Sequence, residues 1–267
     1  MASFEVPSWW RRFLALPNES PSKTLGMAFL VSAVCAVVVS SSATLLKPMQ
    51  EANRRVEKNA RMMQMLRGVP GISELLQDVG AEALEVEVVD LASGRFAEDA
   101  DPARYDASQA GEDERASVVI PPALDVAGLG QRARFATVYL IRDDQRLASV
   151  VVPVYGKGYQ SILRGYLALE SDLDTIAALA FYEHGETPGI GARITEADWQ
   201  AQWAGKRAFD AAGAVVVTVA PGVGEGPHQV DGITGATRTS LGVTHLLRYW
   251  LGPHGFGPML GRLRGAS

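Results

Sequence analysis

The feature that most constrains this chain is a stretch of 22 uncharged, mostly apolar residues near its start, residues 25–46. As a helix rising about 1.5 Å per residue it would be about 33 Å long, which matches the hydrocarbon core of a bilayer. A signal peptide has a shorter apolar region followed by a small-residue cleavage pattern, whereas Leu-Leu-Lys-Pro ends this one. We therefore predict one uncleaved transmembrane helix, preceded by an N-terminal arm over residues 1–24.

The remaining residues predict a stalk helix over 47–70 and a single domain over 71–267. The net charge of −5 and the lack of a basic stripe argue against nucleic-acid binding. The single cysteine, Cys35, excludes a disulfide, a thiolate metal site and an iron–sulfur cluster within the chain. The four histidines lack ligand spacing, so we predict no metal. Basic residues flank both ends of the apolar stretch, so charge alone leaves its orientation open.

Within this domain, the sequence predicts strands and helices in an irregular order. Residues 84–91 alternate apolar and acidic side chains, which is typical of a half-buried strand. Residues 92–117 lack an apolar period and predict a loop. A hairpin is expected from strands at 135–141 and 147–154, and two more strands at 161–169 and 214–219. Two helices are expected at 195–204 and 240–250. Because these elements do not alternate regularly, we predict an α+β fold.

A glycine-rich segment with sequence DGITGAT, residues 231–237, leads into the second predicted helix. Backbone amides at a helix N-terminus suit a phosphate group. The small residues Gly235 and Ala236 leave room for a bulky group beside Thr237. The alternative is an ordinary turn in which Thr237 or Thr239 caps the helix, and spacing alone favours that alternative.

Another glycine-rich segment, residues 183–191, predicts a loop, because Thr187-Pro188-Gly189 is a turn sequence. His184 and Glu186 in this loop could bind polar atoms of a ring, or be solvated in a surface turn. A third segment, GVGEG, is not a Rossmann loop, because a proline stands where the helix should begin.

Several ordered segments resemble one family of respiratory proteins. DGITGAT resembles a covalent flavinylation motif, in which the last threonine is the acceptor. VVPVYGKGYQS, GYLALESDLDTI, FYEHGETPGIGARI, WQAQWAGKR and YWLGPHGFGPML occur in the order found in the C subunits of sodium-translocating NADH:quinone reductases. The resemblance is strong over residues 150–262, and the anchor and stalk also fit it.

This resemblance implies that Thr237 holds FMN through a phosphate ester, without acting as a catalytic residue. It also implies a flavin transferase that uses FAD and recognises Asp231. Gln160 stands where the family has tryptophan, which puts a flavin-stacking role of that loop in doubt. The other cofactor-binding residues expected on this basis are Thr234, Gly235, Ala236, Glu186, Thr187, Pro188, Gly189, Ile190, Gly158 and Tyr159.

The resemblance further implies an electron-relay subunit of a multi-subunit membrane oxidoreductase, carrying electrons from NADH towards ubiquinone. The chain would lie in the bacterial inner membrane with its domain on the extracytoplasmic side. The alternatives are the G subunit of the related Rnf complex, or a membrane-tethered FMN-binding sensor. The segment around EHGETPG and the C-terminal GFGPML favour the sodium-pumping enzyme.

Overall fold

The computed structural model describes residues 15, 17, 20–40, 84–98, 100–102, 105–143 and 146–266. The first of two units contains a helix at Pro21–Ser40 with a mean hydropathy of 1.9. This helix is unburied, and by length and composition it is a candidate membrane span. It overlaps the predicted span at residues 25–40. The rest of that span and the predicted 47–70 stalk lie outside the described residues, so those boundaries stay predictions.

The second unit is built on a seven-stranded antiparallel sheet. Its strand order is β2-β1-β5-β6-β7-β8-β9. The strands are β1 (Leu84–Asp90), β2 (Arg95–Phe96), β5 (Phe135–Asp143), β6 (Arg146–Lys157), β7 (Ile162–Glu170), β8 (Thr175–Glu183) and β9 (Lys206–Arg207). The helices are α4 (Ala107–Glu112), the 3-10 helix η2 (Gly191–Thr195), α5 (Ala197–Ala201), α6 (Thr237–Leu251) and α7 (Gly257–Ala266). Two small sheets pair β3 (Ser117–Val119) with β4 (Gln131–Ala133), and β10 (Thr218–Val219) with β11 (Gln229–Val230). The predicted α+β class is confirmed.

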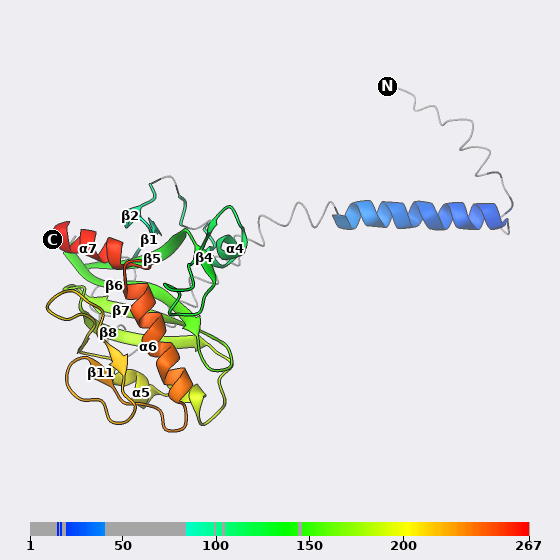
Figure 1. The fold of residues 1–267 in the computed structure, drawn as a ribbon. Coiled ribbons are helices and arrows are strands. Elements are labelled where there is room, and N and C mark those ends of the chain that lie inside the picture. The colour runs from blue at the N-terminus through cyan, green and yellow to red at the C-terminus, as the bar shows by residue number, and fades with distance from the viewer. Residues whose placement is uncertain are drawn as a thin grey trace. The chain divides into compact units, whose positions relative to one another are not determined.

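Helix α6 packs on strand β6 and crosses one face of the sheet (Figure 1). Its apolar stripe, which includes Leu246 and Trp250, is buried in the main core. Glycines let the two elements approach closely. A Cβ on Gly242 would lie 2.6 Å from the Lys157 carbonyl oxygen, and a Cβ on Gly156 would lie 2.7 Å from Leu246 Cβ. This packing fixes the first turn of α6 beside the end of β6.

The predicted hairpin and the predicted strands at 84–91 and 161–169 are confirmed, with shifts of a few residues at their ends. The helix predicted at 240–250 begins earlier, at Thr237. The helix predicted at 195–204 is shorter, covering Ala197–Ala201, because Thr195 ends the 3-10 helix η2 and Glu196 is the N-cap. The strand predicted at 214–219 covers only Thr218–Val219. The predicted loop at 92–117 contains β2 and α4.

Candidate functional site

The acceptor-type threonine, Thr237, is the first residue of α6 and is exposed. The residue before it, Ala236, is the N-cap and makes no side-chain capping hydrogen bond. The prediction that Thr237 or Thr239 caps the helix is therefore wrong. Among the described residues, no hydrogen-bond partner is found for the Thr237 hydroxyl. The first amides of a helix have no acceptor within it, so Thr237 stands beside a positively polarised group of donors.

The turn that leads into α6 is closed by its own backbone and lies against the 183–191 loop. The Ala236 amide donates to the Ile233 carbonyl at 2.9 Å. Gly235 has a φ of +78°, which disfavours side chains, and its Cβ position would lie 3.7 Å from Ile190 Cγ2. The Ile190 side chain is 43% exposed. The turn that precedes Thr237 thus lies against an exposed apolar residue of the 183–191 loop.

Glu186 joins three segments of the site. Its carboxylate accepts hydrogen bonds from the amides of Gln160 at 3.0 Å, Tyr159 at 3.2 Å and Ser161 at 3.3 Å. It also accepts from the Ser161 hydroxyl at 3.4 Å and from the Thr239 hydroxyl at 2.5 Å. We call Glu186 and these four donor residues the Glu186 cluster. The cluster ties the 158–161 loop and the 183–191 loop to the first turn of α6.

At the centre of the Glu186 cluster, Glu186 is 4% exposed and Thr239 is 1% exposed. Burial by itself raises the pKa of this carboxyl, but the hydrogen bonds from Thr239 and the 159–161 amides outweigh burial and hold the pKa below its ordinary value of 4.5. Two glycines make the fit tight. A Cβ on Gly191 would lie 2.7 Å from Thr239 Oγ1, and one on Gly158 would lie 2.7 Å from Glu186 Oε1. The carboxylate is therefore held charged between backbone segments that leave no room for side chains.

The 183–191 loop is also held by bonds of its own. The Glu186 amide donates to His184 Nδ1 at 3.2 Å, so this histidine nitrogen is used within the loop. The amides of Ile190 and Ala192 both donate to the Thr187 carbonyl at 3.1 Å. Pro188 is exposed, and Gly189 has a φ of +72°, as the predicted turn requires.

Tyr159 and Gln160, in the 158–161 loop, contact the first turn of α6 and the 183–191 loop, respectively. Tyr159 is 53% exposed, and the Arg238 guanidinium lies 5.3 Å from the centre of its ring. Gln160, which replaces the tryptophan of the family pattern, donates through Nε2 to Thr187 Oγ1 at 3.0 Å. The substituted side chain therefore links the two loops of the site.

Asp231, the acidic residue that opens the motif, is bonded within the protein. Its carboxylate accepts from the Gly224 amide at 2.7 Å, and its carbonyl accepts from Trp199 Nε1 at 2.9 Å. The Asp231 amide donates to Gln202 Oε1 at 3.0 Å. In this structure the residue fixes the 221–226 loop, while Thr234, two residues before Ala236, is exposed.

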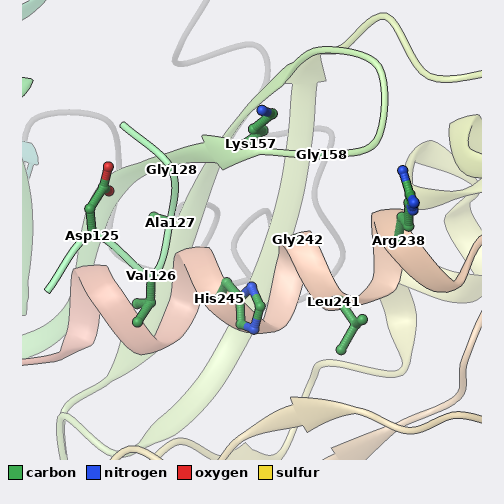
Figure 2. Close-up of a pocket in the computed structure, with 10 residues that line it drawn as sticks. All are labelled: Asp125, Val126, Ala127, Gly128, Lys157, Gly158, Arg238, Leu241, Gly242 and His245. Carbon is green, nitrogen blue, oxygen red and sulfur yellow. The ribbon is translucent and has the colours of Figure 1, made fainter. Parts of the chain in front are cut away.

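On the side of α6 where Arg238 and Leu241 project lies a pocket of about 280 Å³ (Figure 2). We call it the α6 pocket. It is lined by Asp125, Val126, Ala127, Gly128, Lys157, Gly158, Arg238, Leu241, Gly242 and His245. Of these residues, only Gly158 was expected from the sequence to belong to the site. The spacing of Arg238, Leu241, Gly242 and His245, one side of a helix, was the available indication. No group of three or more potential metal ligands occurs among the described residues.

Comparison with known proteins places this geometry in a family. Residues 158–252 match the FMN-binding domain family. A Pseudomonas aeruginosa protein, named as the C subunit of the Na(+)-translocating NADH-quinone reductase, is 41% identical over 254 residues, covering 92% of this chain and 97% of that protein. A Vibrio alginolyticus protein of the same name is 36% identical over 253 residues, covering 94% and 98%.

Solved structures agree with the sequence relatives. The crystal structure of Shewanella oneidensis NqrC superposes with a TM-score of 0.66 at 38% identity, covering 72% of this chain and 88% of that one. The C subunit of the Na(+)-translocating NADH-quinone reductase from Parabacteroides distasonis gives a TM-score of 0.56 at 25% identity, covering 80% and 96%. The chain belongs to the family of C subunits of the Na(+)-translocating NADH-quinone reductase.

Proposed function

We propose that Thr237 carries FMN covalently, through a phosphate ester on its side-chain oxygen. The observation that carries this proposal is the position of Thr237, exposed at the first residue of α6 with a hydroxyl that makes no bond to a described residue. The helix N-terminus favours a negatively charged phosphate there. Gly235 has a positive φ and no side chain, and a Cβ there would meet only Ile190 within 4 Å. The residues present therefore fit a phosphate-linked group.

The chain is an FMN-carrying subunit of the Na(+)-translocating NADH-quinone reductase, an oxidoreductase complex of several subunits. The Rnf-type alternative is not favoured by these relatives. Bound FMN would supply the electron chemistry, while the protein sets its position and surroundings. An ester to Thr237 would keep the flavin from dissociating as it passes electrons from NADH towards quinone.

The other proposed site residues fall into two groups: Glu186 bonds only to other protein groups, and the rest would surround the cofactor. Glu186 positions the first turn of α6 through Thr239, because its oxygens are already occupied by protein donors. Tyr159, whose ring faces Arg238, and Ile190, which lies next to Gly235, offer exposed apolar surface near the turn that carries Thr237. The residues proposed to surround the cofactor are Thr234, Gly235, Ala236, Thr187, Pro188, Gly189, Ile190, Gly158 and Tyr159.

A separate flavin transferase would attach the FMN, with FAD as donor. Asp231 would be part of what that enzyme recognises. Because its carboxylate bonds the Gly224 amide, recognition of the carboxylate would require that bond to open. We also propose that the Pro21–Ser40 helix crosses the bacterial inner membrane once, with the domain on the extracytoplasmic side. Protease added to spheroplasts should then digest the domain, and full protection would contradict this orientation.

Covalent attachment is tested by fluorescence of the denatured chain after gel electrophoresis. The full chain, produced in a host that has the flavin transferase, should give a fluorescent band. Thr237→Ala should give none, while Thr234→Ala, a matched change of a neighbouring exposed threonine, should keep the band. A band that survives in Thr237→Ala would contradict the assignment.

Loss of the chain should also abolish NADH–quinone activity in membranes. A sensor that only binds FMN would leave that activity intact, so retained activity would favour the sensor alternative.

A further inference from the structure

The 221–226 loop is held against the start of the threonine motif by two backbone hydrogen-bond donors. The Gly232 amide donates to the Gly222 carbonyl at 2.7 Å, and the Gly224 amide donates to the Asp231 carboxylate at 2.7 Å. Both chain neighbours of the residue at the loop tip are therefore hydrogen-bonded to the first two residues of the motif. The loop tip and the start of the motif form one continuous surface.

Close backbone packing fixes the position of this loop. A Cβ on Gly224 would lie 2.8 Å from the Val230 carbonyl carbon, and a Cβ on Gly232 would collide with the Ala220 carbonyl oxygen. Only glycine, which has no Cβ, permits two backbone segments to approach each other this closely. Side chains are therefore excluded from the contact between the loop and the motif, and the backbone presents the loop tip in one position.

Val223, at the tip of the loop, is an apolar side chain held in solvent. It is 80% exposed, and among the described residues no other large hydrophobic side chain is more exposed, those of the Pro21–Ser40 helix included. Removal of a valine side chain from water is favourable, and a fixed loop has little conformational entropy left to lose on binding. Val223 is therefore suited to contact a partner protein.

The motif beside Val223 indicates which partner that is. Transfer of FMN from FAD forms a bond between Thr237 Oγ1 and the flavin phosphate, breaks the pyrophosphate bond, and releases AMP and the threonine hydroxyl proton. The enzyme that performs this transfer must reach Thr237 and, on the proposal above, also recognises Asp231. Because the Asp231 carboxylate is bonded to the Gly224 amide, an enzyme that contacts this carboxylate also meets the loop tip.

We propose that Val223 is a docking contact for the flavin transferase, with its side chain bound in an apolar recess of that enzyme. The inference rests on the proposed attachment at Thr237, and it extends what the transferase recognises beyond the motif. Val223 lies outside the reacting atoms. It therefore contributes to binding of the chain by the enzyme and not to the transfer step itself.

The test is attachment of flavin to the purified protein. The full chain is produced without the transferase, purified in detergent and mixed with purified transferase and FAD, and initial rates are measured by in-gel fluorescence at increasing concentrations of the chain. Val223→Ser should raise the concentration that gives the half-maximal rate about tenfold, because an apolar contact is lost, and should leave the maximal rate unchanged. Val223→Ile, which keeps an apolar side chain, should behave like the wild type.

Val119→Ser is the matched control, because Val119 is 74% exposed on β3, outside the loop and the motif. Equal half-maximal concentrations for Val223→Ser and Val119→Ser would overturn the inference. A Val223→Ser chain that accepts flavin normally but no longer co-purifies with the other subunits would also overturn it, because the loop would then contact a subunit. Absence of flavin from the wild-type chain would instead contradict the attachment at Thr237, and the docking contact with it.

Discussion

The two regions beside the first turn of α6 differ in whether their charged side chains are hydrogen-bonded within the protein. On one side, the Glu186 carboxylate is buried and accepts five hydrogen bonds from protein donors. On the other side, the α6 pocket leaves Lys157 and Arg238 accessible to solvent. A group whose hydrogen bonds are all made within the protein can position its neighbours. A group whose hydrogen-bond donors have no partner in the protein can still bind a ligand.

This difference gives each region a separate experimental signature. Changes in the Glu186 cluster should alter the free energy of unfolding and, through it, the position of Thr237. Changes in the pocket should leave the free energy of unfolding nearly unchanged. Substitutions at the cluster and in the loops around it test the first of these two signatures.

The largest effect is expected for Glu186→Ala. The change leaves buried amides and the Thr239 hydroxyl without an acceptor, and each unsatisfied buried donor costs about 1–3 kcal/mol. Allowing for relaxation and water entry, we expect the free energy of unfolding to fall by about 3 kcal/mol in urea titrations. Glu183→Ala, which removes an exposed partner 3.6 Å from Arg164, should cost less than about 1 kcal/mol. Equal losses in the two variants would show that the cluster is not a positioning device.

A smaller loss is expected for Gly191→Ala. The new Cβ would lie 2.7 Å from Thr239 Oγ1 and 2.9 Å from Glu186 Oε2, so the cluster must move apart. Overpacking of this kind costs about 1–3 kcal/mol, measured as a lower urea midpoint. Gly261→Ala on α7 meets no atom within 4 Å and should be neutral or slightly stabilising. A wild-type midpoint in Gly191→Ala would mean that the loops separate without cost.

Acid should weaken the same cluster. Because the pKa of Glu186 is lower in the folded protein than its ordinary value of 4.5, its contribution is complete above that pH and is lost as the pH falls through the folded pKa. Urea midpoints measured below pH 4.5 should therefore fall more steeply for the wild type than for Glu186→Gln. Parallel curves for the two proteins would contradict a charged Glu186.

The smallest effect is expected for Gln160→Ala. It removes one exposed hydrogen bond, from Gln160 Nε2 to Thr187 Oγ1 at 3.0 Å. Substitutions of exposed side chains usually change stability by less than about 0.5 kcal/mol. A thermal melt of the flavin-carrying protein should be nearly unchanged. A loss of stability as large as that expected for Gly191→Ala would show that Gln160 helps to hold the two loops in position.

The sequence predicted the parts of the fold that follow a simple period. The hairpin of β5 and β6 and the apolar stripe of α6 follow strand and helix spacing, and both are present. Strand β8 was missed because it is buried on both faces, so its side chains show no alternation. Helix α7 was missed because three glycines and a proline mask its helical preference.

The site was predicted less completely than the fold. The motif around Thr237 could be identified, because its residues are contiguous. The Glu186 cluster could not, because Glu186 lies 53 residues from Thr239 and backbone amides make most of its contacts. The α6 pocket depends on a turn near Asp125 packing beside Lys157, and no local pattern predicts that pairing.

The most direct test of the central claim is fragmentation mass spectrometry of the peptide that spans residues 231–248, taken from the flavin-carrying chain. If FMN is esterified to Thr237, fragments that contain Thr237 should carry the mass of FMN less one water, and fragments that end at Ala236 or begin at Arg238 should lack it. The same mass on Thr234, Thr239 or Ser240, or an unmodified peptide from a chain that retains its flavin, would contradict it.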